Sequence, residues 1–173
     1  MYNRGFTLLE LLITLAILVL IITMGIPSLS KQFQNTRLQT TTLSLLEAVA
    51  TTRTQAVFIN NRATLKHQGT WENGWEGFID SNNNGQRDAE EKLFLSHEKT
   101  QDVRITANRP LKNYISFIGT GESRFIGEYN NGAFQAGTLK VCPVNKGAGF
   151  ELTLARSGRM RMNEISAAKC NEH

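Results

Sequence analysis

Apolar side chains are concentrated near the amino terminus. From Leu8 to Ile26 the only polar side chains are Glu10, Thr14 and Thr23. At 1.5 Å per residue, a helix of this length crosses a hydrocarbon core of about 30 Å. The pattern therefore predicts a membrane-spanning helix over residues 6–27. Because Arg4 precedes the span, the positive-inside tendency places the amino terminus in the cytoplasm and exports the rest of the chain.

A second helical pattern follows Pro27, which is expected to kink or break the helix between Met24 and Ser28. Over residues 28–61, apolar residues three, four and seven apart form one stripe. It consists of Leu38, Leu45, Leu46, Val49, Ala50, Ala56 and Val57. The stripe predicts an amphipathic helix that packs on a core, exposes its threonines and ends near Asn60–Asn61.

Residues 62–173 change to short runs of β-branched and aromatic residues separated by Gly, Asn and Pro. One helix followed by many strands predicts an α+β domain with antiparallel sheet. Asn130-Asn131-Gly132 predicts a tight turn. The expected strands are residues 63–67, 74–80, 92–97, 103–107, 114–118, 124–129, 138–144, 150–156 and 159–162.

Length, charge and cysteine content narrow the picture. The 173 residues suit one globular domain with an appendage, and the net charge of +4 suits an anionic partner such as nucleic acid or a phospholipid surface. The two cysteines, Cys142 and Cys170, are expected to pair in an oxidising envelope compartment. No C-x-x-C motif supports zinc binding or redox chemistry.

The residues before the apolar run carry a specific pattern, Arg4-Gly5-Phe6-Thr7-Leu8-Leu9-Glu10. An isolated carboxylate inside a bilayer costs about 2.5–3.5 kcal/mol, so Glu10 needs a partner. The pattern resembles the type IV prepilin signature. That resemblance implies a leader over residues 1–5, cleavage between Gly5 and Phe6 by a prepilin peptidase, and methylation of the new amine. It also implies that Glu10 neutralises the amino terminus of a neighbouring subunit in a filament. A plain signal anchor with a stray glutamate is the alternative.

The middle of the chain extends the resemblance. Residues 74–85, followed by Arg87-Asp88 and Glu90-Glu91, are similar to the GspH/FimT family of minor pilins and type II secretion pseudopilins. This implies a type IV pilin fold, in which a long N-terminal helix packs on antiparallel sheet. It also implies a single-pass inner-membrane protein with a periplasmic domain that enters a pilus filament with other pilins.

One loop has the spacing of a calcium site. Asp80, Asn82, Asn84 and Glu91 fit the EF-hand pattern, with Gly85 at the sharp turn. Two of these ligands are neutral and the flanks look like strands, so an Asn/Gly-rich turn is the favoured interpretation. We expect no cofactor.

No catalytic set is evident, because His67, His97 and His173 lie in unrelated contexts and none of the common hydrolase or phosphate-binding motifs occurs. The histidines are expected at the surface. The chain is not expected to be an enzyme.

A candidate phosphate-binding segment lies near the C terminus, Arg156-Ser157-Gly158-Arg159-Met160-Arg161-Met162. If it is extended, Arg159 and Arg161 share one face about 6–7 Å apart, a spacing that suits adjacent phosphates. Gly158 permits a turn that brings Arg156 to the same surface. The alternative is that the arginines only solvate an edge strand. Between the cysteines, five cations outnumber two carboxylates; the cations are Lys146, Arg156, Arg159, Arg161 and Lys169.

Gly158-Arg159-x-Arg161 resembles the G-R-x-R motif of the FimT minor pilins. This resemblance implies non-specific DNA binding for uptake in natural transformation, with Lys146 and Lys169 assisting and Arg53 or Lys66 mattering less. A disulfide between the cysteines would close a loop of about 29 residues, be worth about 3 kcal/mol, and fix the tail that presents the arginines. The rival interpretation is a structural pseudopilin at the tip of a type II secretion filament.

Overall fold

A computed structural model describes residues 7–127 and 132–172, and between residues 24 and 28 it describes the backbone alone. The chain forms two units, residues up to Thr36 and residues from Arg37 onward, and each is described by itself. Gly5 and Phe6 of the predicted processing site lie outside the described residues. So do Asn130 and Asn131 of the predicted turn and the end of the expected strand 124–129.

Helix α1 runs from Leu8 to Ile59 without interruption. Of the two expectations for Pro27, a kink or a break, the break is therefore wrong, and the kink stays a prediction. A proline removes a single backbone hydrogen bond, and a helix that is already propagating through many turns on both sides can tolerate that loss. The predicted end is confirmed, since Asn60 adopts a left-handed backbone with φ of 52° directly after the last helical residue.

The described side chains of the first unit, from Thr7 to Thr23, are all exposed. Thr14 and Thr23 donate their hydroxyls to the carbonyls three residues earlier, at 2.9 and 3.0 Å, so neither hydroxyl depends on solvent. Thr7 caps the helix, because its hydroxyl accepts the backbone N–H of Glu10 at 3.3 Å. Among the described residues, no helix combines the length and apolarity expected of a membrane crossing.

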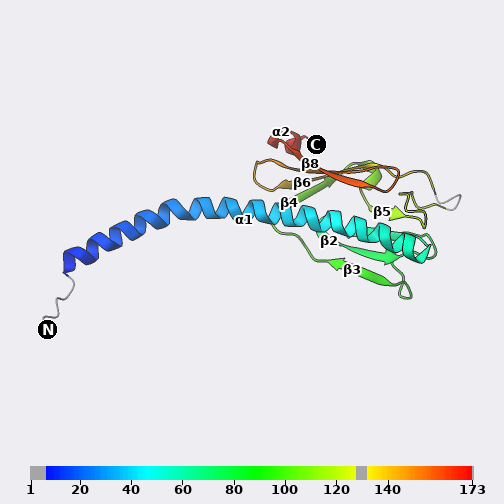
Figure 1. The fold of residues 1–173 in the computed structure, drawn as a ribbon, viewed down its shortest axis with the longest axis horizontal. Helices are drawn as coiled ribbons and strands as arrows, with labels where there is room; N and C mark the ends of the chain where they lie inside the picture. Colours follow the sequence, from blue (N-terminus) through cyan, green and yellow to red (C-terminus); the bar gives the residue numbers. More distant parts are fainter. Residues whose placement is uncertain (1–6, 128–131, 173) are drawn as a thin grey trace. The chain divides into compact units, whose positions relative to one another are not determined.

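The second unit contains two four-stranded antiparallel sheets. Figure 1 shows the ribbon of this unit with most of its strands labelled. The first sheet has the strand order β3-β2-β1-β5. Its strands are β1 (Ala63–Gln68), β2 (Thr70–Ile79), β3 (Leu93–His97) and β5 (Tyr114–Phe117). The second sheet has the order β4-β6-β7-β8. Its strands are β4 (Val103–Ala107), β6 (Gly137–Pro143), β7 (Gly149–Leu154) and β8 (Met160–Ile165).

These strands confirm the α+β prediction, and several of their bounds differ from the expected ones; β8, for example, ends at Ile165 and not at residue 162. The expected strand 124–129 is not formed over its described residues, where Arg124 makes only an isolated bridge to Phe134. Strand β2 begins four residues earlier than expected, because Gly69, with φ of 90°, lets the chain reverse directly out of β1. Two short helices were not predicted, the 3₁₀ helix η1 (Arg109–Leu111) and the helix α2 (Ala167–Asn171).

One core joins α1 to both sheets. Leu45 and Val49 of the helix, Leu65 of the first sheet and Leu139 of the second belong to a single buried cluster. The predicted apolar stripe is confirmed only in part, since Ala50 and Val57 are exposed. Three threonines expected on the surface, Thr41, Thr42 and Thr52, are buried. Thr42 and Thr52 can be buried because each hydroxyl donates to the carbonyl four residues earlier at 2.7 Å.

Candidate nucleic-acid interface

The segment Ala155–Arg159 forms the tight connection between β7 and β8, and we call it the arginine turn. The N–H of Ala155 donates to the carbonyl of Arg159, and the N–H of Gly158 donates to the carbonyl of Ala155, both at 2.9 Å. Gly158 has a φ of 79°, and a Cβ at this position would lie 2.1 Å from the carbonyl oxygen of Gly121. The predicted turn is therefore formed, and only glycine fits it.

A neighbouring loop and the helix hold the arginine turn from behind. Ser123, in the loop after β5, donates its backbone N–H to the carbonyl of Arg156 at 3.3 Å. Its hydroxyl donates to the carbonyl of Ala155 at 3.0 Å. Arg53 of α1 donates to the carbonyls of Gly121 at 2.9 Å and Ser157 at 3.3 Å. The turn is thus held through the carbonyls of its own backbone.

The structure gives Arg53 a role that the sequence did not indicate. Its side chain bridges two loops that are 36 residues apart in the chain, Gly121 and Ser157, so it belongs to the framework of the site. Nothing in the helical pattern distinguished it from the other charged residues of α1. The sequence did not indicate Ser123 either, because its partners in the arginine turn, Ala155 and Arg156, lie more than 30 residues away in the chain.

Strand β8 displays the predicted alternation. Met160, opposite Leu154, packs against the core, whereas Arg161, opposite Thr153, faces outward and is exposed. Arg156 and Arg159 are exposed as well. Met162 was expected on the same face as Met160, but 37% of its surface is accessible, because β8 is the edge strand of its sheet.

The predicted set of cations is divided between two ends of the second sheet. Lys146 lies in the loop between β6 and β7, and Lys169 lies on α2. The loop that carries Lys146 ends at Gly149, and Gly149 pairs with Ile165 on β8. Ile165 lies four residues after Arg161 on the same strand. At about 3.3 Å per residue this separates the two groups by more than about 13 Å. Arg156, Arg159 and Arg161 therefore form one group, and Lys146 and Lys169 another.

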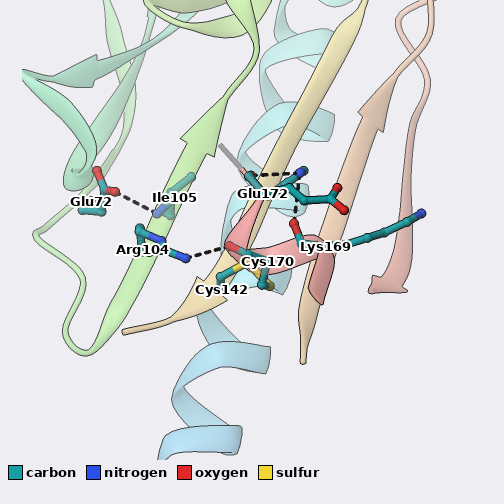
Figure 2. The surroundings of a disulfide bond; sticks show 8 residues. Glu72, Arg104, Ile105, Cys142, Lys169, Cys170 and Glu172 are labelled. Carbon is teal, nitrogen blue, oxygen red and sulfur yellow. Dashed lines mark hydrogen bonds between the residues drawn. A yellow bond between two sulfur atoms is a disulfide. The ribbon is translucent and has the colours of Figure 1, made fainter. Parts of the chain in front are cut away.

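The predicted disulfide between Cys142 and Cys170 is confirmed, and Figure 2 shows its surroundings. It ties α2 to β6, where Arg104 donates to the carbonyl of Cys170 at 2.7 Å and Lys140 donates to the carbonyl of Lys169 at 3.0 Å. Ile165 packs beside the two sulfur atoms. The bond therefore fixes the lysine end of the sheet and not the arginine turn, which corrects the role expected from the sequence.

The loop with calcium-site spacing uses its oxygen atoms internally. The buried carboxylate of Asp80 accepts the backbone N–H groups of Asn84 at 3.0 Å and Gly85 at 3.1 Å and the hydroxyl of Thr64 at 3.0 Å. Burial raises the pKa of the Asp80 carboxyl, and these hydrogen bonds act in the opposite direction. Glu91 accepts the N–H of Ser81 at 2.8 Å.

The asparagines of this loop are occupied in the same way. Asn82 and Asn84 direct their amide N–H groups at the carboxylate of Asp88, at 2.7 and 3.0 Å. Among the described residues, no group of three or more His, Cys, Asp or Glu side chains is arranged to hold a metal ion. These hydrogen bonds hold the Asn/Gly-rich turn together.

His67 and His97 are half-buried and pack on tryptophans, so the expected surface position holds only in part. His97 stacks on Trp75 with ring centroids 4.1 Å apart, and His67 meets Trp71 edge-on at 5.6 Å. Burial lowers the pKa of both imidazoles. His173 lies outside the described residues.

Two family profiles match the sequence. The profile described as "Type II transport protein GspH" matches residues 41–158, and the profile described as "Prokaryotic N-terminal methylation motif" matches residues 1–26. None of the curated proteins matches in sequence.

Among solved structures, the chain is similar to the type IV minor pilin FimU of Pseudomonas aeruginosa strain PAO1 in two crystal forms. In one, the TM-score is 0.59 at 15% identity, covering 75% of this chain and 90% of FimU. In the other, the TM-score is 0.55 at 14% identity, covering 73% and 92%. These likenesses confirm the long helix with antiparallel sheets.

Proposed function

This chain belongs to the GspH family of type II transport proteins, and we propose that it is a minor type IV pilin that binds DNA at its arginine turn. One observation carries the proposal. Arg156, Arg159 and Arg161 are exposed together on one hairpin, and within the described part of the chain none of them forms an ion pair. Their charges are therefore available to an anionic partner.

Exposed guanidinium groups on a short turn suit phosphates. A guanidinium donates two parallel hydrogen bonds to a phosphate, and such contacts position a nucleic acid without reading its sequence. We therefore infer non-specific binding, as uptake of foreign DNA in natural transformation requires. Lys146 and Lys169, at the far end of the sheet, would contact only DNA long enough to span both groups.

The same proposal includes delivery to the envelope. Residues 1–5 act as the leader, cleaved after Gly5, and residues 6–27 anchor the chain in the inner membrane until it joins a filament. The match to a methylation motif over residues 1–26 supports this processing. Residues 28–61 then carry the domain of residues 62–173 on the periplasmic side.

Wild-type protein tests the DNA proposal. Binding to duplex DNA is expected at low salt, with little dependence on base sequence, and the logarithm of the affinity should fall linearly with the logarithm of salt concentration as counterions are released. A mobility-shift or NMR titration at several salt concentrations measures this. Absence of binding at low salt would remove the proposal and favour the rival function below.

Replacing Glu10 with valine should leave membrane insertion intact and reduce incorporation into filaments several-fold, because the carboxylate would no longer pair with a neighbour's amino terminus. The structure supplies a matched control. Glu10 lies three residues after the cap Thr7, the position at which glutamate or glutamine closes a capping box. Glu10→Gln keeps the capping chemistry and loses the charge. Quantifying each variant in sheared pilus fractions separates the roles, and wild-type levels of Glu10→Gln would contradict the pairing.

A second function is favoured by the description of the family profile, type II transport. In that alternative the chain is a pseudopilin that contacts other pseudopilins and secreted proteins. Its arginines then only keep the edge strand β8 exposed to water. Deletion of the gene would then impair secretion of folded proteins and leave DNA uptake unchanged. The DNA-binding pilin gives the opposite pair of phenotypes.

A further inference from the structure

An aromatic ring lies beside the arginine turn. Phe134 is 42% exposed and forms a bridge with Arg124 in the loop after β5. The backbone on either side is fixed, because Gln135 donates its N–H to the carbonyl of Ser123 at 2.9 Å and Phe125 donates to that of Ala133 at 2.8 Å. The ring therefore stands on ordered backbone at the surface.

Arg124 covers one face of this ring, with its guanidinium carbon 3.8 Å from the ring centroid. That guanidinium is itself held by Glu122 at 2.9 Å and by the carbonyl of Gly132 at 3.3 Å. A ring stacked against a fixed guanidinium loses little freedom when a second flat group packs on it, so the position is preorganised.

The charges around the ring favour an anion. Glu122 is paired with Arg124, whereas the exposed guanidinium of Arg156 lies 5.9 Å from the ring centroid and forms no ion pair in the described structure. Ser123 connects the two features directly, since it bonds to the backbone of both Gln135 and Arg156. A ligand that crosses this surface meets a flat apolar ring and, beside it, the exposed guanidinium of Arg156.

We propose that Phe134 is a stacking position for an unpaired base, so that the arginine turn prefers single-stranded to duplex DNA. Bases within a duplex stack on one another and present only their edges, whereas an unpaired base offers its face to an aromatic ring while its phosphates reach nearby cations. This inference rests on the proposed function, since it adds a base contact to the phosphate contacts of the arginine turn.

The test compares two labelled strands of 12 nucleotides, oligothymidine and an abasic strand of the same length and charge. Fluorescence anisotropy is measured with the full chain in uncharged detergent. Wild-type protein should bind oligothymidine about tenfold more tightly, because one stacked base is worth about that factor. Phe134→Leu should abolish the difference and leave abasic binding unchanged, and Phe134→Tyr should retain it. Thermal unfolding of each variant verifies the fold.

The outcomes separate this inference from the function on which it rests. Equal binding of both strands by the wild type, or a Phe134→Leu variant that folds and still discriminates between them, would overturn the stacking position while leaving phosphate binding intact. Binding of neither strand at low salt would remove both proposals. Tight binding of an acidic peptide in place of DNA would identify the surface as a protein-binding site.

Discussion

Replacing Arg159 and Arg161 together with glutamine is expected to weaken duplex DNA binding by more than tenfold at low salt and to flatten its salt dependence. Each phosphate contact releases nearly one counterion from duplex DNA, so two lost contacts should reduce the slope of log affinity against log salt by about 1.8. The slope is the informative quantity, because a partly unfolded variant would lose affinity without this defined change.

The matched control removes two positive charges elsewhere. Lys92 and Lys99 are exposed on either side of β3 in the first sheet, and Lys92→Gln with Lys99→Gln changes the net charge by the same amount. This variant should keep nearly wild-type affinity and slope. If both double variants behave alike, binding depends on the overall charge of the domain and the arginine turn is not the site.

Replacing Cys142 and Cys170 with serine is expected to lower the free energy of unfolding by about 3 kcal/mol, since the bond closes a loop between residues 28 positions apart. For a chain of this size that corresponds to a fall in Tm of about 6–12 °C. Calorimetry or circular dichroism, with reduced wild-type protein as a second sample, measures it.

The position of the disulfide adds a sharper expectation. Below its Tm, the serine variant should bind DNA as the wild type does, because the bond fixes α2 and the Ile165 end of β8, away from the arginine turn. An unchanged Tm would contradict the loop-closure argument. A loss of DNA binding at a temperature where the variant is folded would show that the arginines depend on the bond after all.

Local signals in the sequence predicted much of this fold. The left-handed Asn60 that ends α1, the glycine at position 158 and the alternation of Met160 with Arg161 are all decided by residues close in the chain. The break predicted at Pro27 was wrong because that prediction also rested only on residues close in the chain. The local cost of the proline was visible in the sequence, whereas the strength of a helix extending in both directions was not.

The candidate site was only partly predictable. The arginines themselves formed a motif, but the residues that hold the turn come from α1 and from the loop after β5, through contacts between Arg53 or Ser123 and backbone carbonyls. A carbonyl acceptor leaves no trace in sequence, because every residue has one. The separation of Lys146 and Lys169 from the arginines depended likewise on strand register.

The division of strands between the two sheets permits a particular order of assembly. All four strands of the first sheet lie between residues 63 and 117, whereas β4, at residues 103–107, pairs with β6 only when residues 137–143 are available. A chain that is synthesised from its amino terminus can complete the first sheet while β4 is still unpaired. The second sheet can then close in sequence, β6 on β4, β7 on β6 and β8 on β7. Oxidation can follow once Cys170 is made, and with only two cysteines in the chain it has a single intramolecular product.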